Sequence, residues 1–180
     1  MKEPQLAPKT AYGFPIRSAK ELGLEDYFRK NKNVSGMAWG GGLNGSGQDE
    51  ERSVVINPFA PAMMSSLNRE ALLKVEAARH LMRDNPIPAF PISPEQQAWR
   101  EKSFTSDMPY RTDDNAFRET LISRHLVGDE GPSSPESQKI ADEFYNKFFK
   151  NYDSEPKQLT AMDTFIDPVK NNPLAQFLFK

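Results

Sequence analysis

The strongest helix pattern in the sequence is Leu67-Asn-Arg-Glu-Ala-Leu-Leu-Lys-Val-Glu-Ala-Ala-Arg-His-Leu-Met-Arg83. Its apolar residues recur at spacings of three or four, which places them on one face of a helix. The stripe consists of Leu67, Ala71, Val75, Ala78 and Met82. This stretch therefore predicts an amphipathic helix that packs against the rest of the chain.

Further helix starts lie on both sides of this stretch. Ser93-Pro-Glu-Gln96 supplies an N-cap, a proline at the first helical position and a capping-box partner. Ser134-Pro-Glu136 repeats the cap, and Asp113 or Asp114 begins another apolar run that stops at Gly128. Ser18 is the N-cap expected for a short helix. The expected helices cover about residues 18–30, 67–83, 93–102, 113–127 and 134–152.

Strand signals are few. The best strand candidate is Ser53-Val-Val-Ile-Asn57, which Pro58 and Pro61 close. Before it lies a glycine-rich loop at 36–47, with six of the ten glycines in the chain. The sequence therefore predicts a mainly α fold, a small helical domain of about four to five helices with at most one or two short strands.

Both ends of the chain are rich in proline, which opposes regular helix. Residues 1–17 carry prolines at 4, 8 and 15 and are expected to form an extended N-terminal arm. Residues 153–180 carry Pro156, Pro168 and Pro173 and form a C-terminal extension. The helical body with its glycine-rich loop then spans residues 18–152.

Composition excludes several classes of function. The chain contains no cysteine, which rules out disulfides, thiolate zinc sites and cysteine nucleophiles. Its net charge is -2 and its basic residues do not cluster, which disfavours nucleic acid as the main partner. No segment has the apolar length of a signal peptide or a membrane span, so we expect no membrane partner and synthesis in a cytoplasm. A hydrophobic fraction of 37% predicts a small core.

Two patterns suggest chemistry, and neither is complete. Glu76 and His80 stand at i and i+4, which is half of a metal site. We expect His80 to face solvent or a partner and His125, the other histidine, to pack in the core. Residues 40–45 spell G-x-G-x-x-G, but the strand follows the glycines where a dinucleotide fold needs it to precede them. We therefore predict no catalytic residue, no metal and no cofactor.

The apolar residues near the ends and in the glycine-rich loop are better candidates for contacts with a partner. The closing segment is dense in apolar side chains, and a free terminus of that kind gains stability by docking. The predicted partner-binding residues are Tyr12, Phe14, Trp39, Leu174, Phe177, Leu178 and Phe179.

Four sequence blocks carry a resemblance. They are Trp39-Gly-Gly-Gly-Leu-Asn-Gly, Glu51-Arg-Ser-Val-Val-Ile-Asn-Pro-Phe, Glu76-Ala-Ala-Arg-His and Ser93-Pro-Glu-Gln-Gln. Over residues 36–142 the chain resembles small proteins encoded by tailed bacteriophages and prophages. No activity is attached to that group, so the resemblance implies a setting, the phage particle, and assigns no site residue.

Together these features predict a virion structural or assembly protein of the head, connector or tail. It is expected to be made in the bacterial cytoplasm, to reside in the virion and to contact other virion proteins in several copies through its terminal arms. The alternative is a phage protein outside the particle that binds and modulates a host protein, for which the acidic run Asp49 to Glu51 is the candidate contact. An enzyme is the third reading.

Overall fold

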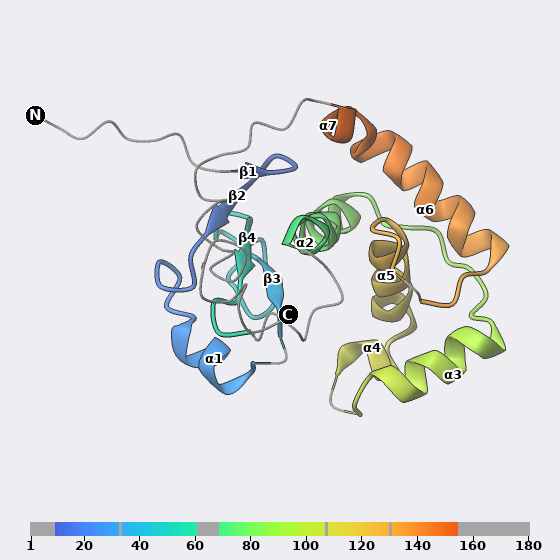
Figure 1. The fold of residues 1–180 in the computed structure, drawn as a ribbon, viewed down its shortest axis with the longest axis horizontal. Coiled ribbons are helices and arrows are strands. Elements are labelled where there is room, and N and C mark those ends of the chain that lie inside the picture. Colours follow the sequence, from blue (N-terminus) through green and yellow to red (C-terminus); the bar gives the residue numbers. More distant parts are fainter. Residues whose placement is uncertain (1–9, 33, 61–68, 107, 130, 155–180) are drawn as a thin grey trace, which may run out of the picture. The chain divides into compact units, whose positions relative to one another are not determined.

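Figure 1 shows the computed structural model, which describes residues 10–32, 34–60, 69–106, 108–129 and 131–154. The chain divides into two compact units, Met1–Phe149 and Lys150–Lys180. The elements described in the first unit are β1 (Thr10–Ala11), β2 (Phe14–Arg17), α1 (Glu25–Lys30), β3 (Gly36–Trp39), β4 (Ser53–Ile56), α2 (Arg69–Asp84), α3 (Pro94–Ser103), α4 (Pro109–Thr112), α5 (Asp114–His125) and α6 (Pro135–Phe148). In the second unit the structure describes α7 (Lys150–Ser154).

The described residues form a mixed α/β fold with a four-stranded sheet in the order β1-β2-β4-β3 (Figure 1). Strands β1 and β2 are antiparallel, β2 and β4 are parallel, and β4 and β3 are antiparallel. The prediction of a mainly helical domain with at most one or two strands is therefore wrong. Residues 10–17, expected to lie in an extended arm, supply two strands of the sheet.

The missed strands had little local signal. Pro15 lies inside β2, and a proline normally argues against a strand because it has no N–H for the ladder. Strand β3 consists of Gly-Met-Ala-Trp and was hidden within a glycine-rich region. Three of the four residues in β3 are buried, so this strand does not show the alternation that marks a half-exposed strand. The strand predicted over residues 53–57 is confirmed as β4.

The sheet is covered on both faces, and neighbouring residues of β4 pack into the two different core clusters. Val54 belongs to the larger core cluster, which includes Ala77 and Ala78 of α2. Its neighbour Val55 belongs to a smaller cluster with Leu24 and Phe28. Because successive strand residues point to opposite faces, α2 and the α1 segment lie on opposite sides of the sheet (Figure 1). Helices α5 and α6 complete the larger core with Phe117, Leu121, Ile122, Ala141 and Phe144.

The predicted helix starts at Ser93, Asp113 and Ser134 are confirmed. Ser93 and Ser134 each form a capping box, and the Asp113 carboxylate accepts hydrogen bonds from two backbone N–H groups. Helix α1 begins later than predicted, at Glu25 instead of Ser18. Ser18 does form reciprocal bonds with Glu21, but Gly23 at φ +67° prevents that turn from continuing into a helix.

Among the described residues, no helix has the length and apolar character that crossing a membrane requires.

Candidate functional site

Glu76 and His80, the pair that suggested half a metal site, both point into the sheet. The Glu76 carboxylate accepts a hydrogen bond from the Ala38 N–H at 2.9 Å and one from Arg79 at 3.2 Å. His80 has 0% exposure, and its Nε2 lies 2.9 Å from the Ser53 carbonyl oxygen. The prediction that His80 faces solvent or a partner is therefore wrong.

The match between helix and strand spacing explains this burial. Four residues along a helix rise about 6 Å, and two residues along a strand rise about 6.7 Å, so the two series stay in step. Leu72 packs on Gly36, where an added Cβ would lie 3.3 Å from the leucine side chain. Glu76 reaches Ala38, two residues along β3 from Gly36. One turn further, His80 reaches across to Ser53 of the neighbouring strand β4, opposite Trp39. The i, i+4 spacing thus joins α2 to the main chain of two strands.

The chemistry of His80 agrees with an anchoring role. A carbonyl oxygen can only accept, so Nε2 carries the proton and Nδ1 does not. Nδ1 is buried without a hydrogen-bond partner among the described residues. Burial lowers the pKa of His80, against the opposing effect of its bond to Ser53, and keeps the ring neutral. Within the described ranges, no group of three or more His, Asp or Glu side chains is placed to hold a metal ion.

The glycine-rich loop is an ordered connection between β3 and β4. Its amides are used internally, since Gly41 N–H donates to the Glu50 carbonyl and Gly42 N–H to that of Gly47, each at 3.0 Å. At Gly40, with φ +91°, an added Cβ would lie 2.2 Å from the Glu51 carbonyl oxygen. The glycines therefore allow backbone segments of the loop to approach closely. Because these amides donate within the loop, they do not form a phosphate-binding site.

Two contacts hold this loop against the carboxyl end of α2. Arg52, which follows the loop, forms a bidentate ion pair with Asp84. Arg83 donates to the Gln48 side chain at 3.0 Å. The loop is consequently fixed to the helix, and so is the position of the residues that it carries.

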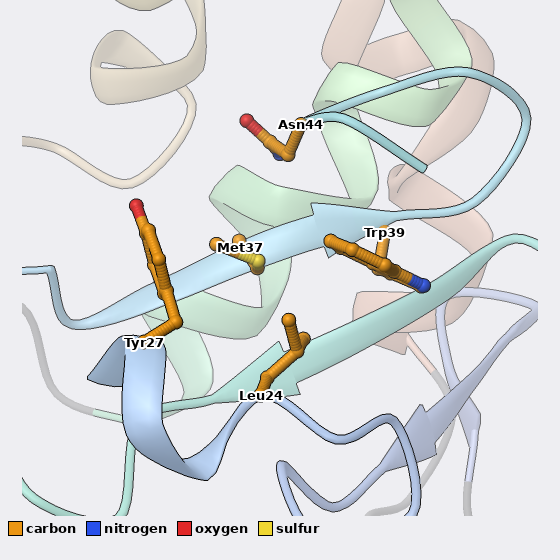
Figure 2. Close-up of a pocket in the computed structure, with 5 residues that line it drawn as sticks. All are labelled: Leu24, Tyr27, Met37, Trp39 and Asn44. Carbon is orange, nitrogen blue, oxygen red and sulfur yellow. The ribbon is translucent and has the colours of Figure 1, made fainter. Parts of the chain in front are cut away.

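A pocket of about 360 Å³ lies between α1, β3 and the glycine-rich loop (Figure 2). Its lining residues are Leu24, Tyr27, Met37, Trp39 and Asn44. Tyr27 is one of the two large hydrophobic side chains that are exposed in the described part of the chain, with 43% exposure. The pocket thus presents two aromatic side chains and two aliphatic ones beside one amide.

The conformation of the glycine-rich loop positions Asn44 at the pocket. Its backbone has φ +48°, a left-handed conformation that asparagine tolerates better than most residues. Its Nδ2 donates one hydrogen bond to the Ala38 carbonyl, which leaves Oδ1 and the second N–H of the amide available. Figure 2 shows this oxygen on the same side of the pocket as the Tyr27 hydroxyl. The rim of an otherwise apolar pocket therefore offers an exposed amide that can both accept and donate a hydrogen bond.

The predicted partner-binding residues fall into three groups. Trp39 lines the pocket. Tyr12 and Phe14 pack against this chain's own core, where the Tyr12 ring meets Phe149 at 4.9 Å and the Phe14 ring meets His80 at 4.7 Å. The closing residues Leu174, Phe177, Leu178 and Phe179 lie outside the described residues.

Sequence reasoning did not assign the other four lining residues to a site. Leu24 and Tyr27 were recognisable as the apolar side of a helix, but their unequal exposure depends on where β3 lies. Met37 and Asn44 fell within the glycine-rich region. The only local signal for the pocket was Trp39, a large aromatic residue beside three glycines.

Comparison with known proteins adds no relative, because no protein-family model, curated protein or solved structure matches this chain.

Proposed function

We propose that the protein is a bacteriophage virion structural or assembly protein that acts through protein–protein contacts. The observation that carries the proposal is the pocket around Trp39 and Tyr27. A water-exposed aromatic wall beside apolar side chains gains free energy when a partner covers it. The phage setting comes from the sequence resemblance over residues 36–142, and the partners are accordingly other virion proteins.

The roles of the buried polar residues support a binding function over a catalytic one. Glu76 and His80 are the pair of ionisable side chains that suggested a metal or catalytic site, and both form hydrogen bonds to the main chain of the sheet. The glycine amides are engaged within their own loop. Among the described residues, the pocket is the surface that we assign to contact with another molecule. The sequence adds the apolar closing segment as a second candidate.

Mass spectrometry of gradient-purified particles tests this proposal. The chain should be present at a constant ratio to the major capsid protein across gradient fractions. A Tyr27→Ala variant should enter particles less, while Tyr152→Ala, which alters the other exposed tyrosine, should enter normally. Absence of the wild-type chain from purified particles would refute a structural role in the virion.

The exposed acidic run Asp49 to Glu51 favours the alternative, a phage protein that binds a host protein. Affinity capture from infected cells, with an Asp49→Asn, Glu50→Gln, Glu51→Gln variant as control, tests it. A host protein that is retained by the wild type and lost by the triple variant would support this alternative.

A further inference from the structure

The glycine-rich loop reverses direction at Asn44 and Gly45. The Ser46 N–H donates to the Leu43 carbonyl at 2.9 Å, which closes a β-turn around this pair. Both central residues have positive φ, +48° for Asn44 and +82° for Gly45. A type I′ turn has this pattern, and Asn-Gly is its preferred central pair. Among the asparagines of the sequence, Asn44 is the only one that glycine follows.

An Asn-Gly pair can modify itself without an enzyme. The backbone nitrogen of the glycine loses its proton to a base in the solvent and attacks Cγ of the asparagine side chain. A bond forms between that nitrogen and Cγ, while Nδ2 takes up a proton and leaves as ammonia, so the two residues share a succinimide ring. Water then opens the ring at either carbonyl and gives aspartate or isoaspartate. Glycine favours the attack because it has no Cβ to obstruct it.

The surroundings of the pair allow this chemistry. Asn44 and Gly45 are both exposed, so water and base reach them. The Gly45 N–H donates to no described residue, and loss of its proton therefore breaks no hydrogen bond among them. Apart from its chain neighbours, no atom lies within 4 Å of the position of a Cβ on Gly45. The turn can therefore rearrange around Gly45 without displacing other parts of the fold.

Two features of the turn restrain the reaction. The Nδ2 atom of Asn44, which must leave, donates a hydrogen bond to the Ala38 carbonyl. In a type I′ turn the backbone also holds the asparagine side chain on the side of Cα that faces away from the next nitrogen. Ring closure therefore requires the turn to open, which breaks the bond to Ala38 and the bond between Ser46 and Leu43.

We propose that Asn44 is a site of spontaneous deamidation, at which the folded chain converts Asn44-Gly45 into isoaspartate and aspartate through a succinimide. The conversion removes the N–H that the Ala38 carbonyl accepts and places a carboxylate beside this carbonyl. Because both groups only accept hydrogen bonds, they repel, and the turn loses its attachment to edge strand β3. The neutral amide at the rim of the pocket becomes a negative charge.

Peptide mapping by mass spectrometry tests the proposal on the folded chain. The peptide with Asn44 should gain the mass of an amide-to-acid change, with isoaspartate in excess and ammonia released in equal amount. The rate should rise with pH, because the attacking nitrogen must lose its proton. Asn146 is the matched control, since it is exposed and its Nδ2 donates to the Asp142 carbonyl at 2.8 Å, but Lys147 follows it. Survival of Asn44 for as long as Asn146 would overturn the proposal.

Unfolding in urea separates the nucleophile from the restraint of the turn. Asn44 should react faster in the unfolded wild type than in the folded chain, because the turn is then open. In urea, Gly45→Ala should react more slowly than the wild type, since a methyl group obstructs the attacking nitrogen. Equal rates of these two unfolded chains would contradict the role of Gly45. These measurements use the purified chain, so their outcome does not depend on whether the chain enters particles.

An Asn44→Asp variant tests the consequence for the loop. Aspartate suits the left-handed backbone but has no N–H for Ala38. Hydrogen exchange of the Ser46 N–H, followed by NMR, should be faster in this variant and in deamidated wild type than in fresh protein. The Phe149 N–H, which donates to the Tyr145 carbonyl at 2.8 Å, serves as a reference and should be unchanged. Equal exchange of Ser46 in all three samples would overturn the detachment of the turn.

Discussion

At the scale of single residues, His80 makes the helix-to-sheet contact sensitive to pH. Burial lowers the pKa of His80 in the folded chain below the ordinary 6.5, and the positive charges of Arg52 and Arg83 lower it further. The hydrogen bond to the Ser53 carbonyl and the negative charge of Asp84 oppose this shift. The unfolded chain therefore binds this proton at a higher pH than the folded chain does. The contribution of His80 to the free energy of unfolding is therefore fully present above about pH 6.5 and is lost as the pH falls below this value.

We expect the free energy of unfolding, measured by urea titration, to decrease from pH 7.5 to pH 5. A His80→Gln variant keeps an N–H for Ser53 and should be less stable at pH 7.5 but show a flatter pH dependence. Burial also lowers the pKa of His125, so a His125→Asn variant measures how much of the pH dependence of stability comes from that residue. An unchanged pH dependence in His80→Gln would show that other groups govern the acid response.

Two glycines of the β3–β4 loop provide a second prediction at the residue scale. Gly40 and Gly45 both have positive φ, but a Cβ at Gly40 would lie 2.2 Å from a backbone oxygen, whereas nothing lies within 4 Å at Gly45. Gly45→Ala should cost about 1–2 kcal/mol from backbone conformation alone. Gly40→Ala should cost at least about 1 kcal/mol more, because the clash moves the backbone. Equal urea midpoints for the two variants would contradict this packing.

At the scale of elements, one buried side chain joins the starts of two helices. Gln96 at the start of α3 has 0% exposure, and its Nε2 donates to Pro132 O and Ser137 Oγ, each at 3.3 Å. Its Oε1 also accepts from Ser93 N–H in the capping box of its own helix. The two similar helix starts seen in the sequence, at Ser93 and Ser134, are therefore neighbours in the fold.

Replacing Gln96 by alanine should lower the free energy of unfolding by about 2–3 kcal/mol, since it leaves a small cavity and unpaired polar groups. Gln97, the next residue of α3, is exposed, and its side chain bonds only to Glu101 among the described residues. Gln97→Ala should change stability by less than about 0.5 kcal/mol. Thermal and urea unfolding of the two variants give the comparison, and similar losses would argue against the link between helices.

Some of the helices and strands could be predicted from the sequence and others could not. Helix starts were predictable because a cap and a proline act within four residues, as at Ser93 and Ser134. Strand β4 was predicted from its Val-Val-Ile run, but β1, β2 and β3 were not, because each has only two to four residues and β2 pairs with a distant segment, as Ile16 does with Val54. Trp39 was predicted to contact a partner, but the pocket that it lines requires α1 and β3 to meet, which no local pattern encodes.

At the scale of the whole molecule, the two core clusters found among the described residues lie in the first unit. Both clusters are built from side chains between Tyr12 and Phe149, within the unit Met1–Phe149.

Deletion of residues 172–180 tests whether the closing apolar segment serves the fold or a partner. Since the described core is built from residues of the first unit, we expect the helical circular-dichroism signal and the unfolding midpoint to remain nearly unchanged. Incorporation into particles should fall, because a cluster of apolar side chains would lose the surface that it buries on a neighbour. Substitution of Phe177 and Phe179 by serine, which keeps the chain length, should reproduce the loss. A deletion variant that loses its helical signal would instead assign this segment to the chain's own core, and the pocket at Trp39 would then remain as the proposed contact.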